Sequence, residues 1–115
     1  MIIVLDTNVL VSGLLTPFGS SGEIVRMITS GRLTLVYDSR ILIEYGDVLN
    51  RPKFQFDKDL VDVLIEYIKK NGKAVTTGPL AKPLPGPDDA PFLEAAIEGK
   101  SEFLVTGNKV HYPVN

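Results

Sequence analysis

The sequence predicts an α/β fold in which helices flank a central parallel sheet. Short apolar runs alternate with segments of helical periodicity, which is typical of parallel strands joined by helical crossovers. The first run, residues 2–5, is continuously apolar and ends at Asp6, as in a central strand buried on both faces. The chain has 115 residues, 44% of them hydrophobic and 23% charged, so we expect one domain over residues 1–115.

Each element follows from apolar spacing between capping and stop residues. The predicted strands are 2–5, 33–37, 74–77 and 103–106. The predicted helices are a short one after Asp6, one from Ser20 or Ser21 to Gly31, one from Asp38 or Ser39 to Arg51, one from Asp57 to Gly72, and one from Asp88 or Asp89 to Gly99. The helix after Asp57 has the clearest stripe, interpreted as core or a dimer surface: Leu60, Val61, Leu64, Ile65 and Ile68. Residues 78–87 include four prolines and two glycines and are predicted to form a loop.

Composition excludes several classes of protein. The chain has no cysteine, so disulfides and thiolate metal sites are excluded. No apolar stretch is long enough to span a bilayer, and Asp6 comes too early for a signal peptide. We therefore expect a cytoplasmic protein without a membrane partner. The net charge of −2 argues mildly against tight nucleic-acid binding but is compatible with an enzyme whose contact with RNA is local and partly metal-mediated.

Polar residues are predicted at one edge of the sheet. In open α/β sheets, ligands bind beyond the carboxyl ends of the strands. Asp6 lies at such an end, as does the turn from Thr106 to Asn108, while Asp88 and Asp89 begin the helix that leads to the last predicted strand. The topology is therefore able to gather these side chains.

Glu44 is the most informative carboxylate. It lies three residues after Ile41 and four before Val48, on or beside the apolar face of its helix. A buried carboxylate needs a partner or a cation, and Mg²⁺ or Mn²⁺ prefers such oxygen ligands. We predict Asp6, Glu44 and Asp89 as metal ligands and catalytic residues.

Four segments follow one another in a recognisable order. They are IVLDTNVL at 3–10, LIEY at 42–45 with VL at 48–49 and RPKF at 51–54, PDDAPFL at 87–93, and LVTGN at 104–108 with HYP at 111–113. This ordered set resembles the motifs of PIN-domain proteins, and within them those of a toxin subgroup related to the VapC-type toxins of toxin–antitoxin pairs. Together the segments cover nearly the whole chain.

The resemblance implies a PIN-like three-layer sandwich and a Mg²⁺- or Mn²⁺-dependent endoribonuclease neutralised by an antitoxin. The acidic positions of the family fall on Asp6, Glu44 and Asp89, with Asp88 as the alternative to Asp89. Residues predicted to orient water or substrate are Thr7, Asn8, Thr106 and Asn108. A homodimer is expected by resemblance alone.

Two features depart from the family. The fourth acidic position is Asn108, which brings no charge to a second metal. The chain stops at Asn115, where the family usually continues into one more strand and a helix, so we expect the last strand and helix to be absent and a sheet edge to be uncovered.

Simpler interpretations remain open for each residue. Asp6 is able to cap the following helix, Glu44 to pair with a basic side chain, Asp88 or Asp89 to begin a helix, and Asn108 to serve a turn. His111, the one histidine, is expected at the surface or in a loop. At the level of function, the alternative to a ribonuclease is a PIN-like module that has lost activity and binds another protein. A receiver-type phosphotransfer domain fits less well, and no glycine-rich phosphate loop follows the first strand.

Overall fold

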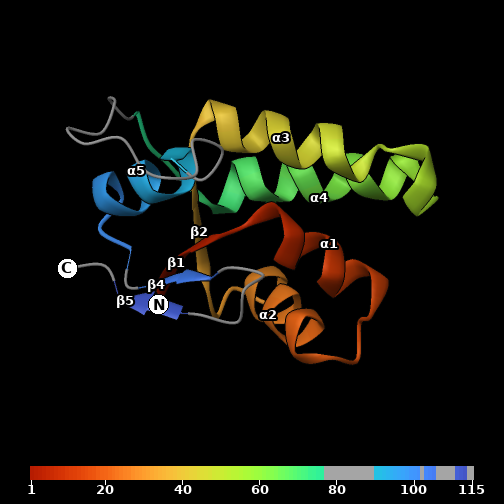
Figure 1. The fold of residues 1–115 in the computed structure, drawn as a ribbon, viewed down its shortest axis with the longest axis horizontal. Helices are drawn as coiled ribbons and strands as arrows, with labels where there is room; N and C mark the ends of the chain where they lie inside the picture. The colour runs from red at the N-terminus through yellow and green to blue at the C-terminus, as the bar shows by residue number, and fades with distance from the viewer. Residues whose placement is uncertain (77–89, 102, 106–110, 114–115) are drawn as a thin grey trace.

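The computed structural model describes residues 1–76, 90–101, 103–105 and 111–113. Five strands form one sheet in the order β3-β2-β1-β4-β5. Their bounds are β1 (Ile2–Leu5), β2 (Thr34–Tyr37), β3 (Lys73–Ala74), β4 (Phe103–Val105) and β5 (His111–Pro113). The first four are parallel, and β5 pairs antiparallel with β4. The predicted α/β class is confirmed, with β1 in the middle of the sheet (Figure 1).

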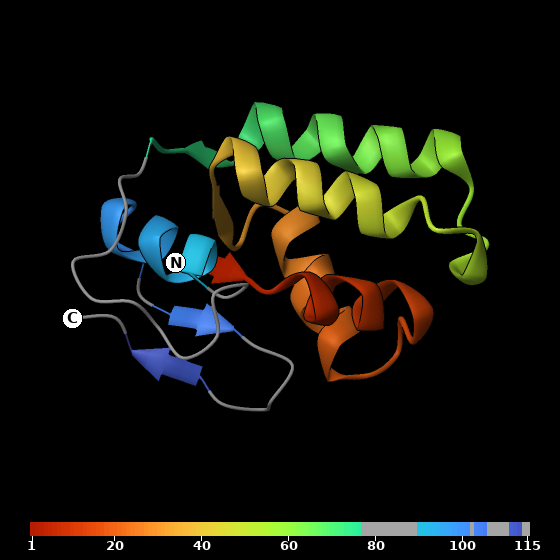
Figure 2. The ribbon, with the colours of Figure 1, turned by 45° about the horizontal axis from the view of Figure 1, so that its top comes forward.

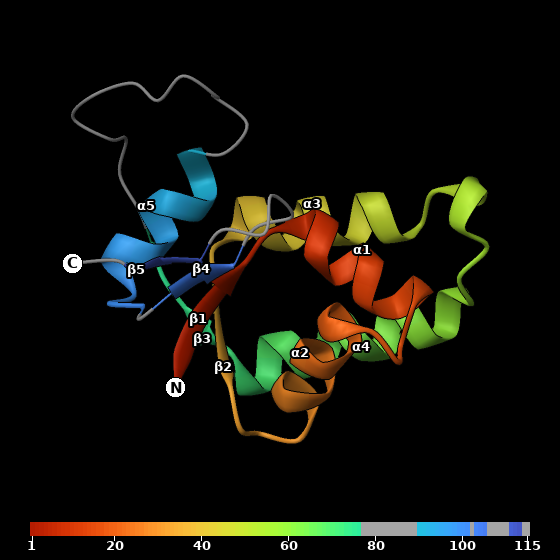
Figure 3. The ribbon, with the colours of Figure 1, turned by 60° about the horizontal axis from the view of Figure 1, so that its bottom comes forward.

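Five helices surround the sheet in the described part of the chain. They are α1 (Thr7–Leu15), α2 (Ser20–Thr29), α3 (Ser39–Leu49), α4 (Lys58–Asn71) and α5 (Ala90–Glu98), with a 3₁₀ turn at Pro52–Phe54. The chain steps from β1 to β2 to β3 in one direction and then returns across the sheet to β4. Because parallel crossovers are right-handed, this reversal places α5 on the opposite face from α1–α4. Figure 3 shows α5 on one side of the strands and α2 and α4 on the other.

The core is formed by the strands and by one stripe of each helix. Val4, Leu5 and Val36 are fully buried, as the continuous apolar runs predicted. Helices α3 and α4 pack side by side (Figure 2), and α3 turns Ile41 and Leu49 inward. No helix in the described residues is both long enough and apolar enough to cross a membrane.

Several predicted helix boundaries are confirmed. The Asp38 carboxylate caps α3 by accepting a hydrogen bond from the Ile41 backbone N–H at 2.9 Å. The Asp57 carboxylate caps α4 in the same way. Gly31, with φ of 83°, follows the end of α2 in the left-handed conformation that glycine adopts without strain.

Other local predictions were wrong or only partly confirmed. Neither Ser20 nor Ser21 is the N-cap of α2, because the N-cap is Gly19 and no side chain caps this helix. The stripe interpreted as core or a dimer surface is divided: Val61 and Ile68 are buried in the core, whereas Leu60, in the first turn of α4, is 68% exposed.

The strand predictions also needed correction. The strand expected at 74–77 is β3, only two residues long and shifted by one residue, and Thr77 lies outside the described residues. The strand at 103–106 is not the last one, because β5 follows it and pairs antiparallel with β4. Its Pro113 conceals the strand in the sequence, yet proline is tolerated at a sheet edge, where one side of the backbone has no partner.

Candidate active site

Asp6 lies at the carboxyl end of the central strand β1. Its backbone N–H donates to the Val105 carbonyl at 2.9 Å, and its own carbonyl accepts from the Val9 N–H at 3.0 Å, so the residue joins the sheet to α1. Asp6 is the N-cap of α1 by position, but its side chain makes no capping hydrogen bond. The half-buried carboxylate is therefore not used as the helix cap that the simpler interpretation proposed.

Thr7 connects this strand end to Glu44. It is the first residue of α1, it is 4% exposed, and its hydroxyl donates a hydrogen bond to Oε2 of Glu44. Glu44 is half-buried on α3, as its spacing from Ile41 and Val48 predicted. The polar partner of Glu44 is thus the residue that follows Asp6, which brings the α3 carboxylate to the end of β1.

Tyr45 makes a second connection between the same two segments. Its side chain is fully buried, and its hydroxyl donates to the Leu5 carbonyl at 2.5 Å. Burial raises the pKa of Tyr45, and the negative charges of Asp6, Glu44 and, more weakly, Asp38 raise it further. Tyr45 therefore stays protonated as a hydrogen-bond donor to the last residue of β1.

The charges of Asp6 and Glu44 suit a bound cation. Among the described residues, no basic side chain forms an ion pair with either carboxylate. Half-buried carboxylates are costly without a compensating charge. Two carboxylate oxygens and nearby hydroxyls are hard donors of the kind that Mg²⁺ and Mn²⁺ prefer. Each of the two carboxylates therefore has the chemistry of a ligand for a divalent metal ion.

The remaining predicted site residues are placed only in part. Asn8 is exposed in the first turn of α1, two residues after Asp6. Asp89 and its alternative Asp88 lie outside the described residues, as do Thr106 and Asn108. His111 belongs to β5 rather than to a loop. Within the described ranges, no group of three or more histidine, cysteine, aspartate or glutamate side chains is placed to hold a metal, so the described site comprises two carboxylates.

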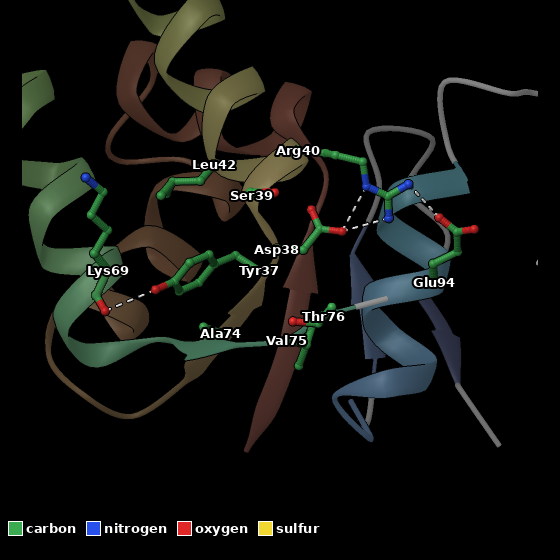
Figure 4. Close-up of a pocket in the computed structure, with 10 residues that line it drawn as sticks. All are labelled: Tyr37, Asp38, Ser39, Arg40, Leu42, Lys69, Ala74, Val75, Thr76 and Glu94. Carbon is green, nitrogen blue, oxygen red and sulfur yellow. Dashed lines mark hydrogen bonds and ion pairs between the residues drawn. The ribbon is translucent and has the colours of Figure 1, made fainter. Parts of the chain in front are cut away.

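Sequence reasoning missed an ion-pair cluster beside this site. The Arg40 guanidinium donates to Asp38 Oδ2 from Nε at 3.0 Å and from Nη2 at 2.7 Å, and its Nη1 lies 2.8 Å from Oε1 of Glu94 (Figure 4). Asp38 and Glu94 are only 4% and 7% exposed. One signal was available: Glu94 lies in the apolar segment of α5, the same pattern that singled out Glu44.

A pocket of about 710 Å³ adjoins this cluster. It opens beyond the carboxyl ends of β2 and β3, and α3, α4 and α5 also contribute to its walls (Figure 4). The Arg40 pKa is raised, chiefly by the hydrogen bond to Asp38, so its guanidinium stays charged.

Comparison with known proteins agrees with this architecture. The sequence model of the family described as PIN domain matches residues 2–110. No curated protein and no solved structure matches the chain significantly. PIN domains are generally nucleases and usually use divalent metal ions. The match covers nearly the whole chain, so this protein belongs to the PIN domain family.

Proposed function

We propose that this PIN domain is a Mg²⁺- or Mn²⁺-dependent endoribonuclease and the toxin of a toxin–antitoxin pair. The observation that carries the proposal is the hydrogen bond from Thr7, which follows Asp6 at the carboxyl end of the central strand, to the carboxylate of Glu44. Asp6 and Glu44 are both half-buried, and no basic side chain among the described residues pairs with them. The toxin assignment rests on the four sequence motifs and on the family.

In this proposal, Asp6 and Glu44 hold the metal ion together with Asp89, or with Asp88 in its place. A bound divalent cation activates water for attack on a phosphodiester and stabilises the leaving oxygen. The chain itself supplies rigidity. Thr7 fixes one carboxylate oxygen of Glu44, so that the ligand does not have to be ordered when metal binds. Asn8, exposed beside Asp6, is placed to orient water or substrate at the rim, a role we also propose for Thr106 and Asn108.

Tyr45 also makes the site rigid, through a hydrogen bond to the backbone. Its hydrogen bond to the Leu5 carbonyl fixes α3 against the last residue of β1. Because Glu44 precedes Tyr45 and Asp6 follows Leu5, this one bond sets the spacing of the two carboxylates. Errors of about 1 Å in such placement reduce catalysis substantially.

We also propose an antitoxin partner and association with a second copy of the chain. Exposed apolar side chains on α3 and α4 are candidate contacts: Ile43 (63% exposed), Leu60 (68%) and Val63 (65%). The second candidate function is a PIN domain without activity that binds another protein. Asn108, which replaces an acidic residue of the family, favours this alternative.

The test is cleavage of a mixed single-stranded RNA pool by purified protein in Mn²⁺ and in EDTA. Asp6→Asn and Glu44→Gln keep size and shape while removing one charge each. Asp62→Asn removes a charge at an exposed position on α4 and is the matched control. We expect cleavage by the wild type and by Asp62→Asn in Mn²⁺ only, and none by the site variants. A folded wild type that cleaves nothing, or cleavage that survives in Asp6→Asn, would contradict the proposal and favour the binding module.

A further inference from the structure

The pocket beside the Arg40 cluster has the dimensions of a ligand site. Its volume of about 710 Å³ lies within the range of roughly 300–1,000 Å³ that small-molecule sites occupy. It lies at the carboxyl edge of the sheet, where ligands of open α/β folds bind. Neither Asp6 nor Glu44 lines it.

The pocket lies at the end of the strand that neighbours β1. Strands β1 and β2 pair in parallel, Asp6 follows the last residue of β1, and Asp38, which lines the pocket, follows the last residue of β2. Neighbouring strands lie about 5 Å apart, which is less than the length of one nucleotide. A strand of RNA with a phosphate at Asp6 therefore reaches the pocket with an adjacent nucleotide.

The walls combine apolar and polar groups. Leu42 and Val75 contribute apolar surface and the Tyr37 ring contributes an aromatic one, with the Tyr37 hydroxyl held by the Lys69 carbonyl at 3.1 Å. Ser39 and Thr76 bring hydroxyl groups and are exposed (Figure 4). This mixture suits a flat heterocycle with polar edges better than a purely aliphatic ligand.

Arg40 provides a fixed planar cation in this pocket. Asp38 and Glu94, both nearly buried, hold the guanidinium, yet the Arg40 side chain is still 47% exposed. RNA-binding proteins stack unpaired bases on arginine guanidinium planes. Among the described lining residues, the negative charges of Asp38 and Glu94 are balanced by the positive charges of Arg40 and Lys69, which is compatible with a neutral base.

We propose that this pocket binds one unstacked RNA base, from the nucleotide next to the scissile phosphate, against the Arg40 guanidinium. The proposal rests on the proposed function for the identity of the substrate, but base binding is measurable without cleavage. It makes Arg40 a determinant of RNA binding and of base preference.

The experiment is a titration of uridine and of adenosine into the protein in EDTA, followed by chemical-shift changes in NMR spectra. Inorganic phosphate is titrated separately. Arg40→Lys keeps the positive charge between the two carboxylates and removes the planar guanidinium. Arg26→Lys is the control, because it makes the same change in an arginine of α2 that also pairs with a carboxylate. Thr76→Trp, at an exposed lining position, obstructs the pocket without touching the ion pairs.

We expect at least one nucleoside to bind, with inorganic phosphate unable to displace it. Arg40→Lys should weaken nucleoside binding by about fivefold or more, given the contribution of base stacking in single-strand binders. Thr76→Trp should also weaken it, and Arg26→Lys should not. Absence of nucleoside binding to folded wild type, displacement by phosphate, or equal affinity in the wild type and Arg40→Lys would overturn the proposal.

An RNA cleavage assay distinguishes failure of the base-binding proposal from failure of the nuclease assignment. If the wild type cleaves RNA, Arg40→Lys should reduce the preference for the base beside the cut, and an unchanged preference would overturn the proposal. If the wild type binds a nucleoside as expected but cleaves nothing, base binding stands and the nuclease assignment fails.

Discussion

Replacing Arg40 by alanine removes the guanidinium that contacts two nearly buried carboxylates. The side chains of Asp38 and Glu94 are 5% and 6% exposed, so water solvates them poorly after the change. Removing one partner of a buried ion pair costs roughly 3–5 kcal/mol. The Arg40 side chain is 47% exposed, which screens the pair and lowers this figure. We expect Arg40→Ala to lower the free energy of unfolding by about 2–3 kcal/mol, a large part of the roughly 5–15 kcal/mol of a typical domain.

Urea unfolding followed by circular dichroism at pH 7 measures this loss. The pKa of Arg40 is raised above its ordinary value, so its contribution is fully present at pH 7 and is lost only in strongly alkaline solution. Adding Glu94→Gln to Arg40→Ala should recover part of the loss, because one buried charge is then removed. Lys69→Ala, which breaks an ion pair whose side chains are 50% and 71% exposed, is the control and should cost at most about 0.5 kcal/mol. An Arg40→Ala loss no larger than that of Lys69→Ala would refute the reasoning.

Two further substitutions test the packing around the site. Tyr45 stays protonated in the fold, while in the unfolded chain it ionises near pH 10.0, so wild-type stability should fall by about 1.4 kcal/mol for each pH unit above that value. Tyr45→Phe should abolish this fall and lower the free energy of unfolding at pH 7 by about 1–2 kcal/mol, because the donor to the Leu5 carbonyl is lost. Urea midpoints that change in parallel in both proteins between pH 8 and 11 would contradict the assignment of the pH dependence to Tyr45. Gly72→Ala should lower the free energy of unfolding by about 1–3 kcal/mol, because the new Cβ would lie 2.6 Å from the Ile68 carbonyl oxygen and 2.7 Å from the Leu35 carbonyl oxygen. An unchanged urea midpoint would show that the backbone shifts freely there.

The sequence predicted the elements whose determinants are local. The apolar run before Asp6, the Asp38 cap and the spacing of Glu44 each depend on residues within a few positions of one another, and the structure confirms all three. The assignment of β1 to the centre of the sheet followed from its continuous apolar character.

The features that the sequence did not predict depend on tertiary context. Arg40 and Glu94 lie far apart in the chain, and no spacing rule brings an α3 residue to α5. The polar partner of Glu44 is the Thr7 hydroxyl, which we predicted only as a substrate-orienting group. Leu60 fits the helical period, but the core beneath the first turn of α4 receives Val61 instead. The roles of Asp88, Asp89, Thr106 and Asn108 stay predictions.

The central claim is that Asp6 and Glu44 hold one divalent metal ion together. Titration of Mn²⁺ while the melting temperature is measured, in the wild type, Asp6→Asn, Glu44→Gln and the double variant, tests it most directly. A metal that binds only the folded state adds about 2.7 kcal/mol at a hundredfold excess over its Kd. We predict that Mn²⁺ stabilises the wild type, that each single variant loses most of this effect, and that the double variant loses little more, because both carboxylates serve one ion. Equal stabilisation of all four proteins, or none in the wild type, would contradict the claim.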